Sequence, residues 1–333
     1  MSARKHTDKD YLFLSTMLRA RASMFISKDA LEHMLSSGSF EEAARILHEL
    51  GWPDMDGLDR AGVDNALSKY REELFAELGR LCPDKELVDL FRLRYDYHNA
   101  KVIIKAQAMG QDMDNLLSAA GRVKLDRLKS AFITGDYRFL PKLLGKAMME
   151  ARDILARTDN PQLADFELDK ACNAEMTSIA KKLDNKYING YVTLHAQGSN
   201  LKACVRCIRM GKSEEFLRNL IFEDRYLERN ISQIHGSSDA IATFFATTPY
   251  KDAAVLGAAA AKGGRLTEFE RMCDNVMVKY LKDARMHGFG PEYVLGFMAA
   301  TENDIACARI ILNSFLSGLS VNTIRERLRD TYV

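Results

Sequence analysis

Residues 99–110 read NAKVIIKAQAMG, and a matching stretch returns as NLKACVRCIRMG at 200–211 and as CARIILNSFLSG at 307–318. The three copies align without gaps. The second, fourth, fifth and sixth columns are apolar in every copy, and the last column is always glycine. Apolar residues at this spacing predict an amphipathic helix, and a closing glycine is the residue that most often ends one.

Basic residues occupy the third column of every copy and the seventh column of the first two, while Asn313 takes the seventh place in the third copy. The two columns are four residues apart and therefore share one face of a helix. This face has two interpretations. It is either a solvated face whose cations favour a helix C-terminus, or one of three related faces lining a central opening that receives a partner. The basic residues are Lys101, Lys105, Lys202, Arg206 and Arg309.

Helical signals extend over the rest of the chain. Ser27 and Ser39 each precede acidic residues and are typical N-caps, and Pro83 marks the start of the helix that runs into the first copy. Each repeat glycine is followed by a short helical return, expected at 113–117, 214–220 and 321–328. We therefore expect an all-α protein of three similar helical units. The expected units are 1–120, 121–222 and 223–333, packed as one body because no low-complexity linker separates them.

Composition restricts the class of protein. The net charge is only +1, from 47 basic and 46 acidic residues, which argues against a nucleic-acid binder. The longest fully apolar stretch, 253–261, is shorter than the roughly 20 residues that cross a bilayer. The first ten residues lack an apolar signal segment, and the six cysteines are scattered. These features predict a soluble protein of a reducing cytoplasm.

One motif is a candidate for catalysis, the C-x-x-C of Cys204 and Cys207. A metal site would need further ligands at fixed spacing, and none accompanies it. In the repeat alignment Cys204 shares the column of Ile103 and Ile311, so both cysteines are interpreted as packing residues. A redox or metal protein using this pair is the weaker alternative. No phosphate loop is present either, because Arg206 stands where that motif requires glycine. We expect no enzyme, no cofactor and no nucleotide site.

Residues 93–106, LRYDYHNAKVIIKA, resemble the LR-x-D-x-HN stretch in the C subunit of bacterial and archaeal V-type ATPases, which also runs into an amphipathic helix and a glycine. Other segments resemble that family in the same order along the chain. Two positions depart from its pattern, Gln197 in the second copy and Cys307 in the third. The further resembling segments are 11–25 with Arg19 and Arg21, 191–211, and 291–318 with Glu302 and Arg309.

The resemblance implies a funnel-shaped body of three similar helical units around a pseudo-threefold axis. It also implies a non-catalytic rotor subunit that transmits torque between ATP hydrolysis or synthesis and ion translocation. Its partners would be the central stalk, subunits D and F, and the membrane rotor ring of proteolipid subunits. It would lie on the cytoplasmic side, attached to the membrane through protein contacts only.

Together with the repeat, the resemblance predicts that the five basic residues lie near the funnel lining and help to hold the stalk. The main alternative is a generic helical-repeat scaffold unrelated to ATPases.

Overall fold

A computed structural model describes residues 6–222 and 224–333, which are helical and contain no strand. The all-α prediction is confirmed for this part of the chain. The helices are η1 Asp8–Tyr11, α1 Leu12–Ala20, η2 Arg21–Met24, α2 Lys28–Ser37, α3 Phe40–Glu49, α4 Arg60–Leu81, α5 Lys85–Met109, η3 Asp114–Leu116, α6 Leu125–Thr134, α7 Lys142–Thr158, α8 Pro161–Leu183, α9 Lys186–Arg209, α10 Glu214–Leu220, α11 Arg225–Gly236, α12 Ser238–Phe245, α13 Lys251–Ala261, α14 Leu266–Lys282, η4 Asp283–Met286, α15 Pro291–Leu316 and α16 Val321–Arg327.

The three copies form the second halves of α5, α9 and α15, which are 25, 24 and 26 residues long. Each helix ends where predicted, because Gly110, Gly211 and Gly318 adopt left-handed backbone with φ of 60°, 60° and 68°. In each copy the amide after the glycine donates back to the carbonyl five residues earlier, the pattern of a Schellman cap. These bonds join Gln111 to Ala106, Lys212 to Cys207 and Leu319 to Ser314, at 3.1, 3.0 and 3.0 Å.

The returns after the glycines differ in length. Helix α10 covers the predicted range, and α16 ends one residue before the predicted end. The first return is only the 3-10 turn η3. There the Asp112 carboxylate accepts the Asp114 amide at 2.9 Å, a local turn that competes with a regular helix.

The predicted N-caps are confirmed. The Ser27 hydroxyl accepts the Ala30 amide at 3.1 Å, and the Ser39 hydroxyl accepts the Glu42 amide at 3.2 Å. Both serines have extended backbone, as residues preceding a helix require. These caps fix where α2 and α3 begin.

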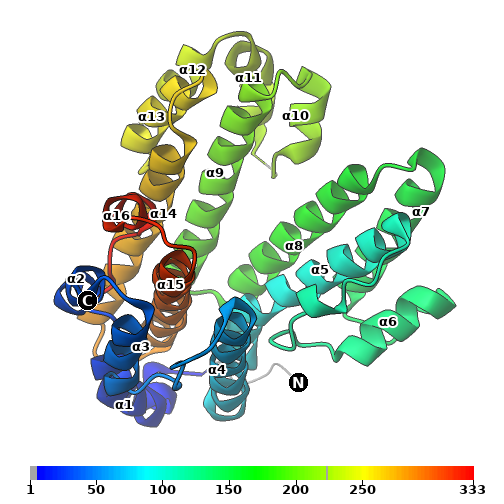
Figure 1. Ribbon diagram of the computed structural model, residues 1–333. Helices are drawn as coiled ribbons and strands as arrows, with labels where there is room; N and C mark the ends of the chain where they lie inside the picture. Colours follow the sequence, from blue (N-terminus) through cyan, green and yellow to red (C-terminus); the bar gives the residue numbers. More distant parts are fainter. Residues whose placement is uncertain (1–5, 223) are drawn as a thin grey trace.

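Three hydrophobic clusters hold the helices together, and each contains the second half of one repeat helix. One surrounds α5 with α6, α7 and α8 and reaches the first halves of α9 and α15. Another joins the end of α9 to α10–α14. The last joins α2, α3 and α4 to the end of α15 and to α16, so helices from the first and last parts of the sequence share a core. Figure 1 shows these groups, with the α9–α13 arm and the α5–α8 arm diverging from a common base.

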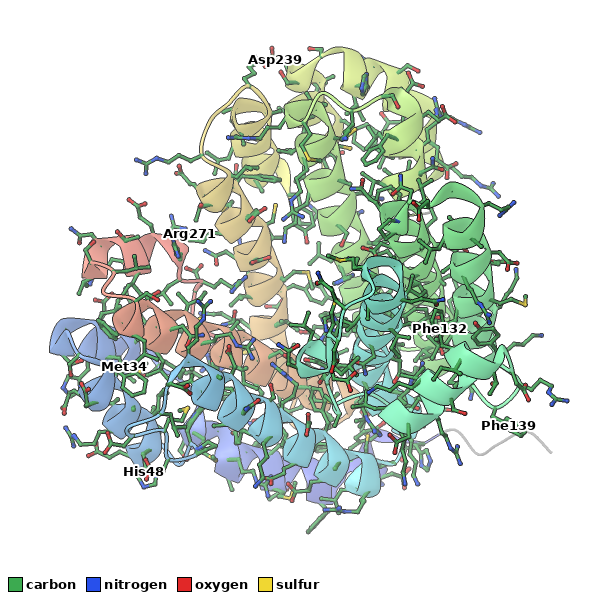
Figure 2. All side chains as sticks on the ribbon, turned by 45° about the vertical axis from the view of Figure 1, so that its right-hand side comes forward. Met34, His48, Phe132, Phe139, Asp239 and Arg271 are labelled. Carbon is green, nitrogen blue, oxygen red and sulfur yellow. The ribbon has the colours of Figure 1, made fainter. Side chains whose placement is uncertain are left out.

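The predicted cuts near residues 120 and 222 fall outside helices, and the division into 1–120, 121–222 and 223–333 stays a prediction. No helix within the described residues is long and apolar enough to cross a membrane. Some apolar side chains are nevertheless exposed at the edge formed by α6 and α7. Phe139 is 77% exposed and stands at the periphery in Figure 2, whereas Phe132 of α6 is buried.

Candidate functional site

The basic columns of the first copy face acidic residues on α8. Lys101 pairs with Asp169, and Lys105 pairs with Asp165 at 2.5 Å. The acids are also four residues apart, so a basic stripe on α5 matches an acidic stripe on α8. Earlier residues of α5 meet later residues of α8, which shows that the two helices are antiparallel.

The second copy repeats this arrangement on α14. Lys202 pairs with Asp274 at 2.7 Å, and Arg206 pairs with Glu270 at 2.6 Å. The acids again are four residues apart and run in the opposite order. Asp274 also accepts from Arg329, at 2.6 Å, which ties the C-terminal segment to α14.

The third copy uses α4, which comes from the other end of the chain. Arg309 pairs with Asp64 at 2.8 Å, and the Asn313 amide donates to the same carboxylate at 3.4 Å. The neutral Asn313 therefore shares one acid with Arg309 where the other copies use two acid–base pairs. The repeated basic face thus matches an acidic neighbour in all three copies.

The basic face had two interpretations, a solvated face or the lining of an opening that receives a partner, and these ion pairs bear only on the first. The five residues do not form a freely solvated face, because each is bound to an acid of its own chain. Their side chains still retain contact with solvent, from 22% exposure for Lys101 to 55% for Arg206. Such pairs contribute about 0–1 kcal/mol each and act mainly on helix register. Their proposed contact with a stalk stays a prediction.

In two copies the side chain in the first column of the repeat forms hydrogen bonds with the backbone of the loop that follows the helix. The Asn99 amide donates to the Ser118 carbonyl at 2.8 Å and accepts the Ser118 amide at 2.9 Å. Asn200 makes the same two-way contact with Phe222, at 3.3 and 2.8 Å. Both asparagines are buried and pin the loop that follows their helix. In the third copy the buried thiol of Cys307 replaces this amide, so the departure seen in the sequence removes a polar contact.

Three residues before that column, two copies carry a buried aspartate. Asp96 accepts from Arg122 at 2.7 Å and from the Val123 amide at 3.0 Å. Asp304 accepts the Ile26 amide at 2.8 Å, and its other oxygen is buried without a hydrogen-bond partner of good geometry among the described residues. Burial raises the pKa of Asp304 to about 7. The second copy has Gln197 at this place.

Five residues before the first column stand Arg94, His195 and Glu302, one on each repeat helix. All three line one cavity of about 280 Å³ between α5, α9, α14 and α15. These positions were not predicted from the repeat, because the three copies carry different residue types there. Extending the alignment of the three copies by five residues toward the N-terminus would have shown that the positions are equivalent.

The polar groups of this cavity differ in how well they are paired. Glu302 is held by Arg71 at 3.1 Å and by the Tyr95 hydroxyl at 2.6 Å. The guanidinium of Arg94 lies 5.2 Å from the centre of the Phe91 ring and makes no hydrogen bond or ion pair with any described residue. The Nδ1 atom of His195 is buried and has no hydrogen-bond partner in residues 6–222 and 224–333. Burial, followed by the charges of Arg94 and Lys202, lowers the pKa of His195 to about 4.

The C-x-x-C thiols lie in the hydrophobic interior, as expected of packing residues. Cys204 and Cys207 are both free and buried. Burial raises the pKa of the Cys204 thiol to about 12, whereas a reactive cysteine needs a lowered pKa. Across residues 6–222 and 224–333, no group of three His, Cys, Asp or Glu side chains is placed to hold a metal ion.

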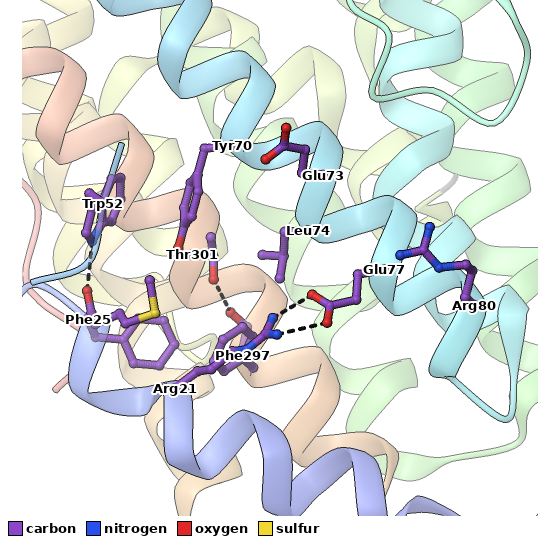
Figure 3. Close-up of a pocket in the computed structure, with 11 residues that line it drawn as sticks. Arg21, Phe25, Trp52, Tyr70, Glu73, Leu74, Glu77, Arg80, Phe297 and Thr301 are labelled. Atoms are coloured by element: carbon purple, nitrogen blue, oxygen red, sulfur yellow. Dashed lines mark hydrogen bonds and ion pairs between the residues drawn. The ribbon is translucent and has the colours of Figure 1, made fainter. Parts of the chain in front are cut away.

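The two arginines of the opening segment act within the fold. Arg19 donates to the carbonyls of His287 and Gly288, at 2.5 and 3.0 Å. Arg21 forms a two-pronged pair with Glu77, at 2.6 and 2.8 Å, at the edge of a second cavity of about 320 Å³ (Figure 3). They connect the N-terminal segment to α4 and to the loop before α15.

The arrangement defines a class of protein: a helical body with an internal repeat and no recognisable catalytic centre in the described residues. Comparison with known families identifies which one. The family model described as ATP synthase (C/AC39) subunit matches residues 14–327. The chain belongs to this family, whose members are non-catalytic subunits of V-type ATP synthases.

Relatives match over almost their full length. The V-type sodium ATPase C subunit of Enterococcus hirae is 25% identical over 327 residues, which cover 97% of this chain and 99% of the relative. The V-type ATP synthase C subunit of Thermus thermophilus is 22% identical over 328 residues, covering 96% and 98%. The resemblance at 93–106 is thereby confirmed.

Proposed function

We propose that this chain is the rotor subunit that couples the central stalk, subunits D and F, to the proteolipid ring of a V-type ATPase. The observation that carries the proposal is the family match over residues 14–327. It would sit peripherally on the cytoplasmic side and bind the membrane complex through protein contacts. It would transmit torque between ATP hydrolysis or synthesis and ion translocation.

We also infer that α5, α9 and α15 are arranged around a pseudo-threefold axis as a funnel. Two observations support this inference. The same columns make equivalent contacts with α8, α14 and α4. The starts of two repeat helices are joined, because Asn185 at the start of α9 donates to Glu292 in the first turn of α15 at 2.6 Å. From the common base, two arms diverge (Figure 1).

A coupling part must be stiff and must hold its partner in register. Stiffness is favoured by the three hydrophobic clusters and by the acid–base pairs between neighbouring helices. Register at an interface is fixed better by polar and charged contacts than by apolar area alone. We propose that Lys101, Lys105, Lys202, Arg206 and Arg309 offer their solvent-facing sides to acidic groups of the stalk while remaining paired within the chain.

The test is a reconstituted V-type ATPase assembled with and without this chain. Without it, we expect ATP hydrolysis by the catalytic part to continue while ATP-driven ion transport is lost, and adding the purified chain should restore transport. Transport that is equally strong in its absence would contradict the proposal. A generic scaffold would leave transport unchanged, whereas a redox role for Cys204 would make transport depend on that thiol.

A further inference from the structure

The cavity between α5, α9, α14 and α15 contains more positive than negative groups. Its lining includes the cations Arg94, Lys202 and Arg329 and the anions Asp274 and Glu302. Asp274 is shared by Lys202 and Arg329, at 2.7 and 2.6 Å. Glu302 is occupied by Arg71, which is buried. Among the described residues, Arg94 forms no ion pair of its own; against the lowering effect of burial, neighbouring Tyr191 and Glu302 raise the pKa of its guanidinium.

The unpaired guanidinium has a geometry suited to one kind of ligand. Arginine presents a planar fork of donors that matches a carboxylate or phosphate in a two-pronged contact. The ring of Phe91 lies beside it, at 5.2 Å, and leaves these donors unused. The volume of about 280 Å³ accommodates an acidic side chain but no large body.

His195 adds a second unsatisfied group in the same cavity. Its Nδ1 atom is buried and has no hydrogen-bond partner among the described residues. An arriving carboxylate would offer an acceptor to this imidazole, and its negative charge would offset the positive charges of Arg94 and Lys202. Two features, an arginine without an ion pair and an imidazole nitrogen without a hydrogen-bond partner among the described residues, thus indicate the same ligand chemistry.

We propose that this cavity is a binding site for a carboxylate, and that its occupant is an Asp or Glu side chain of the central stalk, held by Arg94 and His195. The proposal rests on the proposed function, which places the stalk against the repeat helices. Arg94, His195 and Glu302 come from equivalent columns of the three copies. One acidic side chain held by Arg94 and His195 would contact α5 and α9 and would resist rotation of the stalk against this chain, while Glu302 of α15 stays paired with Arg71.

The experiment titrates the chain of 333 residues with purified D–F stalk by isothermal calorimetry. Arg94→Met keeps the bulk of the side chain and should weaken binding roughly 30-fold, the usual effect of removing one partner of a buried charge pair. Arg94→Lys should give an intermediate loss, since it keeps the charge and loses the fork. The matched control is Arg80→Met, which removes an exposed guanidinium on α4 with the same change of charge. Thermal unfolding of each variant verifies the fold.

The outcomes separate the two proposals. Equal binding of wild type and Arg94→Met would overturn the carboxylate site and leave the coupling role standing. Failure of the wild-type chain to bind the stalk would overturn the coupling role together with the site. A further titration uses acetate and inorganic phosphate against the chain alone. Tight binding of either that depends on Arg94 and does not compete with the stalk would assign the cavity to a free anion and contradict the proposal.

Discussion

Asp304 shows how a single residue of the repeat can carry an unfavourable charge inside the fold. It is 1% exposed, and within the part of the chain that the structure describes one of its oxygens accepts the Ile26 amide while the other has no partner of good geometry. Burial raises its pKa to about 7. Its counterpart Asp96 differs because Arg122 lies against it at 2.7 Å. The same column therefore holds a paired acid in one copy and, within the described residues, an acid without a cation in another.

Replacing Asp304 by Asn should alter the pH dependence of stability. The folded-state pKa lies above that of the unfolded chain, so the favourable contribution is complete below about pH 4 and is lost as pH rises to about 7. The variant cannot ionise. Relative to wild type, its free energy of unfolding should rise by about 3 kcal/mol between pH 5 and pH 8. Urea unfolding of both proteins across this range measures the difference.

The matched control for this prediction is Asp239→Asn, at the periphery of the molecule (Figure 2). Asp239 is 74% exposed, so its difference from wild type should stay flat from pH 5 to pH 8. A flat difference for Asp304→Asn as well would show that Asp304 is ionised at pH 5 and would contradict the account of its burial.

At the scale of elements, the repeat glycines and apolar columns were enough to predict α5, α9 and α15 and their ends. The acidic partners were not predictable in the same way. Asp64 lies on α4, 245 residues before Arg309, and no local pattern connects them. They meet only because α4 packs against α15 in the folded chain. The spacing of four residues between Glu270 and Asp274 was a signal, but it does not reveal which basic stripe it faces.

The helix ends can be tested by substitution. Gly110 has a φ of 60° and open space around its missing side chain, so Gly110→Ala should cost about 1 kcal/mol through backbone strain alone. Gly236, the last residue of α11, has equally open space and no positive φ. Gly236→Ala should therefore be neutral or slightly stabilising. Similar unfolding midpoints for the two variants would refute the capping role of Gly110.

Exchanging the charges of Arg206 and Glu270 tests separately whether Arg206 stabilises the fold and whether it binds the stalk. Arg206→Glu should lower stability by about 0.5 kcal/mol, and adding Glu270→Arg should restore it, because the pair re-forms with its charges exchanged. If the basic face also contacts the stalk, affinity for D–F should fall in both variants. Recovery of affinity in the exchanged pair would limit Arg206 to a role within the chain.

At the scale of the whole molecule, α2 and α3 from the first part of the sequence and α16 from the last part share one hydrophobic cluster. Ile324 of α16 and Leu328 pack with residues of α2 and α3, and Arg325 pairs with Glu32 at 2.5 Å. The N-terminal helices α2 and α3 therefore supply part of the core around the third repeat helix, α15. The sequence predicted three units in linear order. The contacts between the first and last parts of the chain were not predictable, because the hydrophobic pattern of a helix does not indicate which other helix it packs against.

Truncation of Ile324 should therefore affect distant segments. The side chain is fully buried, so Ile324→Ala should cost about 3 kcal/mol. Amide hydrogen exchange should accelerate in α2 and α3, which share its cluster, and should stay unchanged in α11–α13. Val255→Ala is the control, since Val255 is 61% exposed on α13. Equal acceleration throughout the chain would show that the clusters unfold as one unit.

The proposed joining of the stalk to the ring by this chain can be measured in a sedimentation assay with lipid vesicles that carry the purified proteolipid ring. The D–F stalk is added alone or together with the chain. We predict that the stalk sediments with ring-bearing vesicles only when the chain is present, and that vesicles without rings retain neither. Sedimentation of the stalk without the chain, or its absence in both conditions while each protein remains folded, would contradict the proposal.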